Sequence, residues 1–209
     1  AAKIEQKLQE ARLELALHQI KPHFLQNALM SIKVLCRTRP KEAEQAVYDF
    51  AVFLRGNMNA LESAEMILFR EECKTIERYL HIEKMRFGER LQVQWDLQEE
   101  KFQIPPLTIQ PLVENAVCHG ICQKMEGGTV QIRSFRKNGE ICVQILDDGA
   151  GFDTEKLKDA DGIAIRNLKL RLKEFLNADL EIESRKGEGC RQTIHIPWEE
   201  TEDENYSDR

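Results

Sequence analysis

A heptad pattern of apolar residues near the N-terminus constrains the fold of this chain more than any other feature. The apolar positions alternate steps of four and three residues, the spacing of a helix that packs along a narrow seam. A helix from residue 4 to residue 36 would extend about 50 Å. A monomeric domain rarely buries a helix that long, so we expect a homodimer through residues 4–61. The seam consists of Ile4, Leu8, Ala11, Leu15, His18, Pro22, Leu25, Leu29, Ile32 and Cys36.

A second amphipathic helix is expected to follow directly. Pro40 marks a break in the first helix, and the stretch from Pro40 to Leu61 again carries apolar residues at helical spacing. Two long helices with a short link predict an antiparallel hairpin, and hairpins from two chains make a dimeric four-helix bundle. We assign residues 1–66 to this dimerisation domain.

From about Phe69 the pattern changes to that of an α+β domain, which we assign to residues 67–198. Helices are expected at 69–87, at 106–121 (opened by Pro105 and Pro106) and at 164–176. Strands are expected at 91–97, 129–136, 140–148, 179–184 and 191–197, with hairpin turns at 138–139 and 186–189. The order of these helices and strands along the chain predicts an α+β sandwich in which helices cover one face of a mixed sheet.

The net charge of −6 is concentrated in the C-terminal tail. Residues 199–209 hold six acids and one arginine, which leaves the body of the chain near −1. This balance argues against a nucleic-acid partner, and the tail is expected to be a disordered acidic end. No apolar run approaches the roughly 18 residues of a membrane span.

The six cysteines form no CxxC pair, which indicates a reducing cytosol. Cys118 and Cys122 would share a helical face, with His119 between them, so a metal site is conceivable there. Buried cysteines that act as small apolar residues are several times more common, and we favour that interpretation.

Two short motifs could carry chemistry in the helical regions. Pro22 precedes His23 beside the seam, where a partly exposed, mostly neutral imidazole could act as a nucleophile. Asn115 and His119 lie one helical turn apart, and a carboxamide oxygen can bind Mg²⁺. Taken singly, a surface histidine on a kinked helix and a polar helix edge explain these residues better.

Two further motifs lie in loops. In ILDDGAGFD, Asp147 ends an apolar strand and could accept a hydrogen bond from an exocyclic amine, and the following glycines allow close backbone approach. A tight turn explains this stretch as well. The glycines of DGIAIRNLKLRL and KGEGC could expose N–H groups to phosphate, with Arg166, Lys169 and Arg171 nearby, but an ordinary helix cap is an equal explanation.

The order of these motifs resembles that of the LytS/YesM-like family of sensor histidine kinases. The phosphoacceptor block of the family looks like QINPHFLFN, and this chain reads HQIKPHFLQN. EECKTIERYLHIEKMRF is similar to EExxxIxxYLxIxxxRF, and IPPLTIQPLVENAVCHG to IPxLILQPLVENAIKHG. This chain has DDGAG where the family has DNGxG, and GIAIRN where the family has GIGLxN. The resemblance covers nearly all of residues 19–197.

This resemblance implies the cytoplasmic catalytic core of a two-component sensor kinase, with a GHKL-type ATP-binding domain after the hairpin. His23 would be the phosphoacceptor, Glu114 its polarising group, Asn115 the Mg²⁺ ligand, and Asp147 the residue that binds the adenine amine. The other nucleotide-binding residues implied are His119, Gly149, Gly151, Gly162 (the hinge of a lid), Asn167, Gly187 and Gly189. The implied cofactors are ATP and Mg²⁺. The implied partners are a second copy of the chain and a response-regulator receiver domain, with a membrane sensor region upstream of this sequence.

The chain also departs from the family. An acid follows the phosphoacceptor in many other histidine kinases, whereas Phe24 follows it here. Cys118 stands in place of a lysine, Ala164 of a lid glycine, Cys190 of a threonine and Gln26 of a phenylalanine. We therefore expect an active kinase with weakened ATP binding. The alternatives are a pseudokinase scaffold, or a GHKL ATPase or serine kinase without phosphohistidine.

Overall fold

The computed structural model describes residues 22–62, 65–153 and 163–198. Its α-helices are α2 (Pro22–Thr38), α3 (Pro40–Glu62), α4 (Phe69–Phe87), α5 (Gln110–Asn115) and α6 (Ile163–Leu176). Its strands are β1 (Ile67–Leu68), β2 (Leu91–Leu97), β3 (Gln103–Ile104), β4 (Gly128–Lys137), β5 (Glu140–Asp147), β6 (Asp179–Arg185) and β7 (Gly189–Pro197). Shorter helical turns are η1 (Gly88–Arg90), the π-helix η2 (Ala116–Gly120) and η3 (Ile121–Gln123). None of the helices in these ranges is long and apolar enough to cross a membrane.

Helices α2 and α3 form the expected hairpin, and α2 buries only part of the predicted seam. The seam residue Ile32 is buried, whereas the seam residue Leu29 is 57% exposed. Phe24 and Leu35, which lie beside the seam, are also buried, because α2 packs against both α3 and α4 of its own chain. The part of the seam before residue 22 lies outside the described residues, as does the acidic tail at 199–209.

Five strands form the expected mixed sheet in the order β2-β4-β5-β7-β6. Strands β2 and β4 are parallel, and the other neighbours are antiparallel. The turn between β4 and β5 has φ values of 52° at Asn138 and 76° at Gly139, as the two-residue hairpin loop requires. Alternate residues of β5, including Ile141, Val143 and Ile145, point into the core, and the residues between them point to the open face of the sheet.

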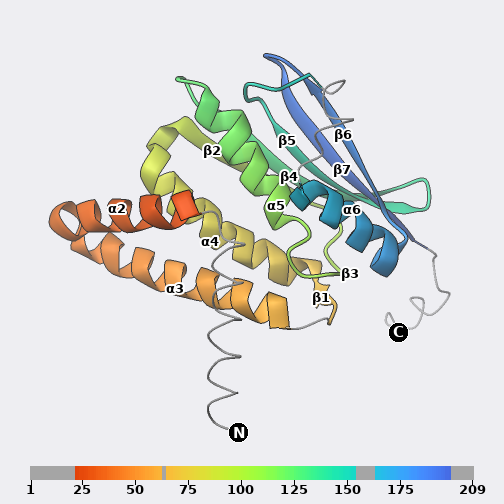
Figure 1. Cartoon of the computed structure of the whole chain (residues 1–209), viewed down its shortest axis with the longest axis horizontal. Coiled ribbons are helices and arrows are strands. Elements are labelled where there is room, and N and C mark those ends of the chain that lie inside the picture. Colours follow the sequence, from red (N-terminus) through yellow and green to blue (C-terminus); the bar gives the residue numbers. More distant parts are fainter. Residues whose placement is uncertain (1–21, 63–64, 154–162, 199–209) are drawn as a thin grey trace, which may run out of the picture.

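Helices α4, α5 and α6 cover one face of the sheet, and the hairpin packs on α4 on the side away from the sheet (Figure 1). Aromatic rings join the hairpin to α4: the Phe24 ring lies 5.3 Å from that of Phe53 and 5.1 Å from that of Tyr79. The main hydrophobic core extends from Phe24 to Ile196 of β7, and a second, smaller cluster lies between α2 and α3. The two regions that we assigned to residues 1–66 and 67–198 therefore share one core in this conformation.

The expectation that Pro105 and Pro106 open a helix is wrong. Helix α5 begins at Gln110, and Leu107 adopts a φ of 57°, which no α-helix contains. The hydroxyl of Thr108 donates to the carbonyl of Pro105 at 2.5 Å, so this segment forms a turn ahead of the helix.

The start of α5 is fixed by a side chain from another helix. The buried carboxylate of Glu72, in α4, accepts the backbone N–H groups of Ile109 at 2.5 Å and Gln110 at 3.0 Å. No side chain of α5 caps its own N-terminus. A carboxylate at this position satisfies two helix-end donors and interacts favourably with the helix dipole.

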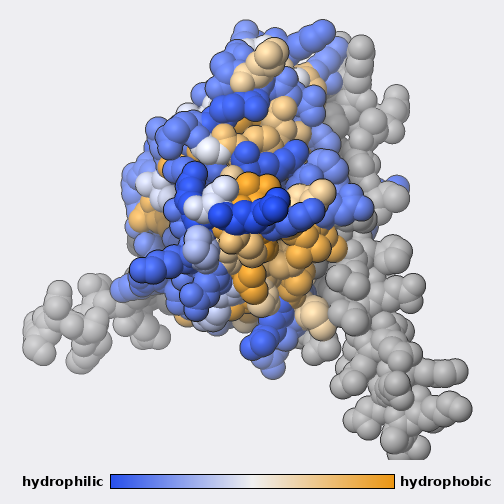
Figure 2. Space-filling view, turned by 90° about the vertical axis from the view of Figure 1, so that its left-hand side faces the viewer, coloured by the Kyte–Doolittle hydropathy of each residue, from blue (hydrophilic) through white to orange (hydrophobic). Residues whose placement is uncertain are grey.

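The hairpin presents apolar side chains to solvent. Figure 2, which looks onto the hairpin end of the molecule, shows apolar atoms gathered at the level of the hairpin among hydrophilic ones. More than half of each of five large side chains on α2 and α3 is exposed: Leu29, Met30, Val34, Val47 and Tyr48. Exposed apolar patches of this kind mark association surfaces.

Replacing Glu72 with leucine should lower the free energy of unfolding by about 2–4 kcal/mol, because two buried N–H groups lose their acceptor. Glu72→Gln keeps an acceptor oxygen and should cost much less. Urea denaturation at pH 7 measures both changes, with Glu77→Gln on the exposed side of α4 as the control. Equal losses in the two Glu72 variants would contradict the capping role.

The same variants test a pH dependence. Burial raises the pKa of Glu72 to about 7 from its usual 4.5, although the N–H groups of Gln110 and Ile109 lower it. The folded protein then binds a proton that the unfolded chain releases between these values, so stability should fall as pH rises from 4.5 through 7. Glu72→Gln should flatten this part of the stability profile.

Candidate functional site

The carboxyl group of Asp147 lies where β5 leaves the sheet. Asp147 is 7% exposed, and its Oδ1 accepts the N–H of Gly149 at 3.0 Å. Burial raises the pKa of Asp147 to about 6; the Gly149 N–H lowers it, Asp148 raises it, and the Cys190 N–H lowers it. A carboxylate has room for several donors, so this buried group has acceptor capacity left for a ligand N–H.

The neighbouring Asp148 has a different environment. Its side chain is exposed, and its Oδ1 accepts the N–H of Thr129, at the start of β4, at 2.7 Å. Its carbonyl oxygen accepts a hydrogen bond from Lys124 Nζ at 2.8 Å. Asp148 and Lys124 therefore hold the loop to the rest of the domain, while Asp147 faces inward. The sequence pattern alone did not assign either of them a role.

Gly120 and Gly149 enclose the Asp147 carboxyl with backbone. A Cβ atom at Gly120 would lie 2.3 Å from Asp147 Oδ1, and one at Gly149 would lie 2.3 Å from the Gly120 Cα. The N–H of Ala150 donates to the Gly120 carbonyl at 3.2 Å. From the sequence we expected Gly149 in the site but did not identify Gly120, which is the last residue of the VENAVCHG motif. Only glycine fits at either position.

The other expected glycines of this region lie on β7 and in adjacent loops. Gly189 has a φ of +85°, and a Cβ there would lie 1.9 Å from the carbonyl oxygen of Asp147. The DDGAG loop contacts the β6–β7 turn through Gly151, which packs against the Arg185 carbonyl, and through the Gly187 N–H, which donates to Ala150 O at 2.6 Å. Gly187 itself is exposed, with open space around its Cα.

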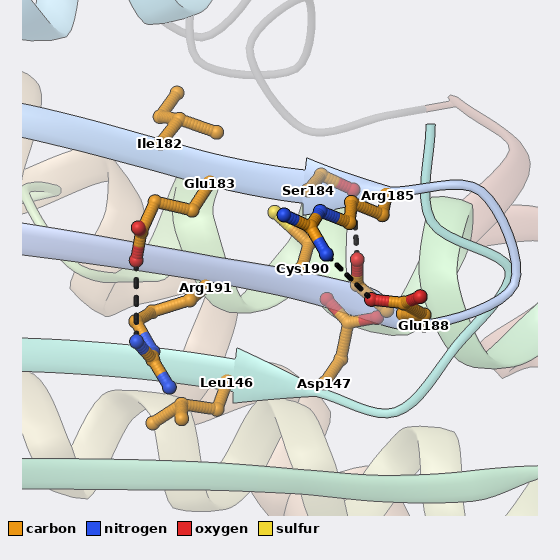
Figure 3. A pocket seen from close by; sticks show the side chains of 10 residues that line it. Leu146, Asp147, Ile182, Glu183, Ser184, Arg185, Glu188, Cys190 and Arg191 are labelled. Carbon is orange, nitrogen blue, oxygen red and sulfur yellow. Dashed lines mark hydrogen bonds and ion pairs between the residues drawn. The ribbon is translucent and has the colours of Figure 1, made fainter. Parts of the chain in front are cut away.

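A pocket of about 610 Å³ opens at this end of β5, β6 and β7. Figure 3 shows Asp147 and Cys190 at its floor, with Ser184 beside them. Arg185 and Glu188 form an ion pair of 3.8 Å at the rim. The pocket therefore combines one buried acceptor with a charged rim, an arrangement that suits a polar ligand with an N–H donor.

Asn115 and Glu114 form the last turn of α5, and both are half-buried. The Glu114 carboxylate accepts a hydrogen bond from Gln110 Nε2 at 2.8 Å. The chain continues as the π-helix η2, which begins directly after Asn115 and includes His119. His119 is exposed, whereas Asn115 remains at the edge of the domain interior.

His23 is exposed on α2, directly after Pro22, which is the first described residue of that helix. The amide nitrogen Nδ2 of Asn27 lies 3.0 Å from His23 Nδ1 and 3.3 Å from Nε2. Sequence reasoning missed Asn27, although it lies four residues after His23 and hence on the same helical face.

The remaining expected residues are less closely associated with Asp147. Gly162 lies outside the described residues, and Asn167 is exposed on α6. Arg171 turns away from the pocket, because its guanidinium donates to the carbonyl of Pro106. Cys118 and Cys122 are half-buried, and among the described residues neither belongs to a group of three potential metal ligands, in keeping with small apolar residues.

Comparisons with known proteins agree with this arrangement. Residues 11–91 match the family model described as "Histidine kinase", and residues 106–200 match "Histidine kinase-, DNA gyrase B-, and HSP90-like ATPase". The uncharacterized protein YwpD of Bacillus subtilis is 36% identical over 203 residues, which cover 92% of this chain and 73% of YwpD. The sensor protein LytS of Bacillus cereus is 30% identical over 94% of this chain but only 36% of LytS, so the chain spans little more than a third of that protein.

The fold is shared with a solved histidine kinase domain. The histidine kinase domain of the blue-light activated histidine kinase EL346 from Erythrobacter litoralis superposes with a TM-score of 0.52 at 16% identity, over 90% of this chain and 91% of that domain. The expected α+β architecture with a helical N-terminal part is thereby confirmed. Since both family models match in the expected order, this chain belongs to the LytS-like family of sensor histidine kinases and comprises their catalytic core domains.

Proposed function

We propose that this chain transfers the γ-phosphoryl group of ATP to His23 and then to an aspartate of a response-regulator receiver domain. The observation that carries the proposal is the buried Asp147 carboxyl, enclosed by glycine backbone at the floor of a pocket. The same chain exposes His23 on a helix that packs against the domain holding this pocket.

In this proposal Asp147 accepts a hydrogen bond from the exocyclic amine of adenine. Asn115 would hold Mg²⁺ through its carboxamide oxygen, a hard donor of the kind that Mg²⁺ prefers. When bound, Mg²⁺ offsets negative charge on the phosphates. Gly149, Gly151 and Gly189 shape the wall around the nucleotide, and the segment with Gly162 is assigned the lid.

Asn27 is proposed to set the tautomer of His23. The structure has Asn27 Nδ2 facing the ring. A flip of the carboxamide, which interchanges its nitrogen and oxygen, would let the oxygen accept Nδ1–H and leave the Nε2 lone pair free. A bond then forms between Nε2 and the γ-phosphorus as the bond from that phosphorus to the bridging oxygen breaks, and ADP leaves. We assign the polarising role to Glu114, whose carboxylate accepts a hydrogen bond from Gln110 in this conformation.

The parent protein is proposed to be a dimeric sensor in the cell membrane, with this chain as its cytoplasmic part. The support is the likeness to LytS, of which the chain spans little more than a third. The exposed apolar side chains of α2 and α3 supply the surface for a second copy.

A pseudokinase scaffold is the second candidate function, and one observation favours it. Cys118 stands where a lysine is usual, and its Sγ lies 4.0 Å from the Tyr79 hydroxyl. Lys124, a cation that lies near Asp147 in the fold, donates to the Asp148 carbonyl. With little positive charge near the phosphates, ATP would bind weakly, and the protein would then act as a scaffold that binds a regulator without transferring phosphate.

His23→Gln should abolish incorporation of radiolabelled γ-phosphate while leaving ATP affinity unchanged, because His23 lies outside the nucleotide pocket. His81→Gln, which alters a half-exposed histidine of α4, is the matched variant and should keep the label. The label should be acid-labile and base-stable. A wild-type protein that binds ATP but takes up no label would favour the pseudokinase, and a label that survives in His23→Gln would show that another residue is the acceptor.

Asp147→Ala should weaken binding of a non-hydrolysable ATP analogue by about 10- to 150-fold, the loss expected when the acceptor of a hydrogen bond to a charged group is removed. Because the pKa of Asp147 is about 6, wild-type affinity should also fall as pH drops below 6 and the carboxyl gains a proton. Calorimetry measures both effects. Asp147→Asn has no carboxyl group at this position, so the pH dependence of its affinity shows how much comes from protonation of the nucleotide itself. Asp148→Asn, which keeps an acceptor for Thr129, should change affinity little.

Light scattering of residues 1–209 should give a dimer at micromolar concentration, because Leu29 and Val34 are 57% and 59% exposed in the single chain. Leu29→Glu combined with Val34→Glu should produce a monomer, since two buried charges per chain would oppose association. Leu170→Glu, at a residue of α6 that is 62% exposed, is the control and should leave the dimer intact. A monomeric wild type would contradict the proposed assembly.

A further inference from the structure

Glu140, Cys142 and His195 lie together on the open face of the sheet, away from the helices that cover its other face. One ligand atom of each, a carboxylate oxygen, a thiol sulfur and a ring nitrogen, lies within 4.8 Å of the others. Among the described residues, this is the group in which potential metal ligands from a cysteine, a histidine and an acid lie within 4.8 Å of one another. Neither the sequence motifs nor the proposed kinase reaction uses any of the three residues.

The backbone of the sheet fixes this cluster. Cys142 of β5 and His195 of β7 are direct cross-strand partners. Glu140 comes two residues before Cys142 and therefore points to the same face of the sheet. The three side chains project from neighbouring strands in the interior of a five-stranded sheet, so their spacing does not depend on a loop.

The imidazole of His195 is held in an orientation that suits metal binding. Its Nδ1 lies 3.0 Å from Glu140 Oε2 and 3.9 Å from Cys142 Sγ, and its Nε2 lies 3.5 Å from Oε2 of Glu181 on β6. A histidine that binds a metal commonly donates its other ring N–H to a carboxylate, which fixes the tautomer. Glu181 is placed to take that N–H and leave the Nδ1 lone pair facing Glu140 and Cys142.

An ordinary ion pair between a histidine and a carboxylate does not require a thiol beside it. The chain has such a pair between His81 Nδ1 and Asp49 Oδ2 at 2.6 Å, and no thiol is part of it. At the Glu140 cluster the third group is Cys142, which is only 3% exposed and directed at the same ring nitrogen. Sulfur, nitrogen and oxygen donors in one set are the combination that binds Zn²⁺ in proteins.

We propose that Glu140, Cys142 and His195 bind a zinc ion, with Glu181 as the residue that orients the imidazole. The thiol proton passes to solvent on binding, and water completes a four-coordinate site. The ion would clamp β5 to β7 at the ends opposite Asp147 and Gly189, so it stabilises the two strands that carry the nucleotide pocket. This site is separate from the ATP pocket and does not depend on the proposed kinase activity.

The test uses the whole chain, freed of metal by a chelator and kept reduced. Titration with Zn²⁺ should show one tight site per chain, and Co²⁺ in its place should give the absorption of a cobalt–thiolate bond. At a hundredfold excess of Zn²⁺ over Kd, the melting temperature should rise by roughly 5–10 °C. Cys142→Ser and His195→Gln should each weaken binding at least tenfold and remove this rise.

Matched variants separate this site from other thiols and histidines. Cys36→Ser and His81→Gln should bind Zn²⁺ as the wild type does. Glu181→Gln should keep the stoichiometry and the cobalt–thiolate absorption but weaken binding by about tenfold, as expected for an orienting carboxylate. Circular dichroism confirms that each variant is folded. Tight binding that survives in a Cys142→Ser, His195→Gln double variant, or wild-type binding no tighter than in that variant, would overturn the proposal.

Discussion

The buried carboxyl group of Glu72 is the interaction on which the arrangement of the helices depends. It belongs to α4, caps the first N–H groups of α5, and lies close enough to Arg171 of α6 for each charge to influence the other. Arg171 in turn donates to the carbonyl of Pro106, in the turn before α5. The three helices that cover the sheet therefore meet at one charged group, and the position of Asn115 at the end of the six-residue α5 follows from it. A helix this short has little stability of its own.

The hairpin is joined to this arrangement by a second buried polar contact. Gln110 Nε2 donates to Asn57 Oδ1 of α3 at 2.9 Å and to Glu114 of its own helix at 2.8 Å. Beside it, Phe24 packs on Tyr79, whose hydroxyl lies near Cys118. Any displacement of the hairpin relative to α5 must break the Asn57 bond and change the surroundings of Glu114. Since buried polar groups cost free energy when left unpaired, the conformation of the hairpin and that of the helix bearing Asn115 are linked.

Local periodicity was sufficient to predict most elements of this chain, because each of them is stabilised by its own repeating pattern. The hairpin break at Pro40, helix α4, the strands of the sheet and the turn at Asn138-Gly139 all lie where the sequence placed them. The start of α5 could not be predicted, because its cap is Glu72, a residue of another helix. The burial of Phe24 beside the predicted seam could not be predicted from periodicity alone, because its ring packs on Tyr79 of α4. Gly120 and Asn27 were missed for a related reason: their importance lies in contacts with Asp147 and His23 that only the fold reveals.

The departures from the family pattern affect side chains, whereas the described wall of the Asp147 site is mostly backbone. Cys190 replaces a threonine, yet its N–H still lowers the pKa of Asp147, and its own thiol is held protonated by burial, with a pKa of about 12. Gly120 and Gly149 lie against the carboxyl group, and Gly189 lies against the main-chain carbonyl of Asp147; no side-chain replacement at 118 or 190 alters these main-chain atoms. The geometry that would select adenine is therefore independent of the charges that would hold the phosphates. Replacements at Cys118 and Cys190 can weaken nucleotide affinity without changing which nucleotide the pocket accepts.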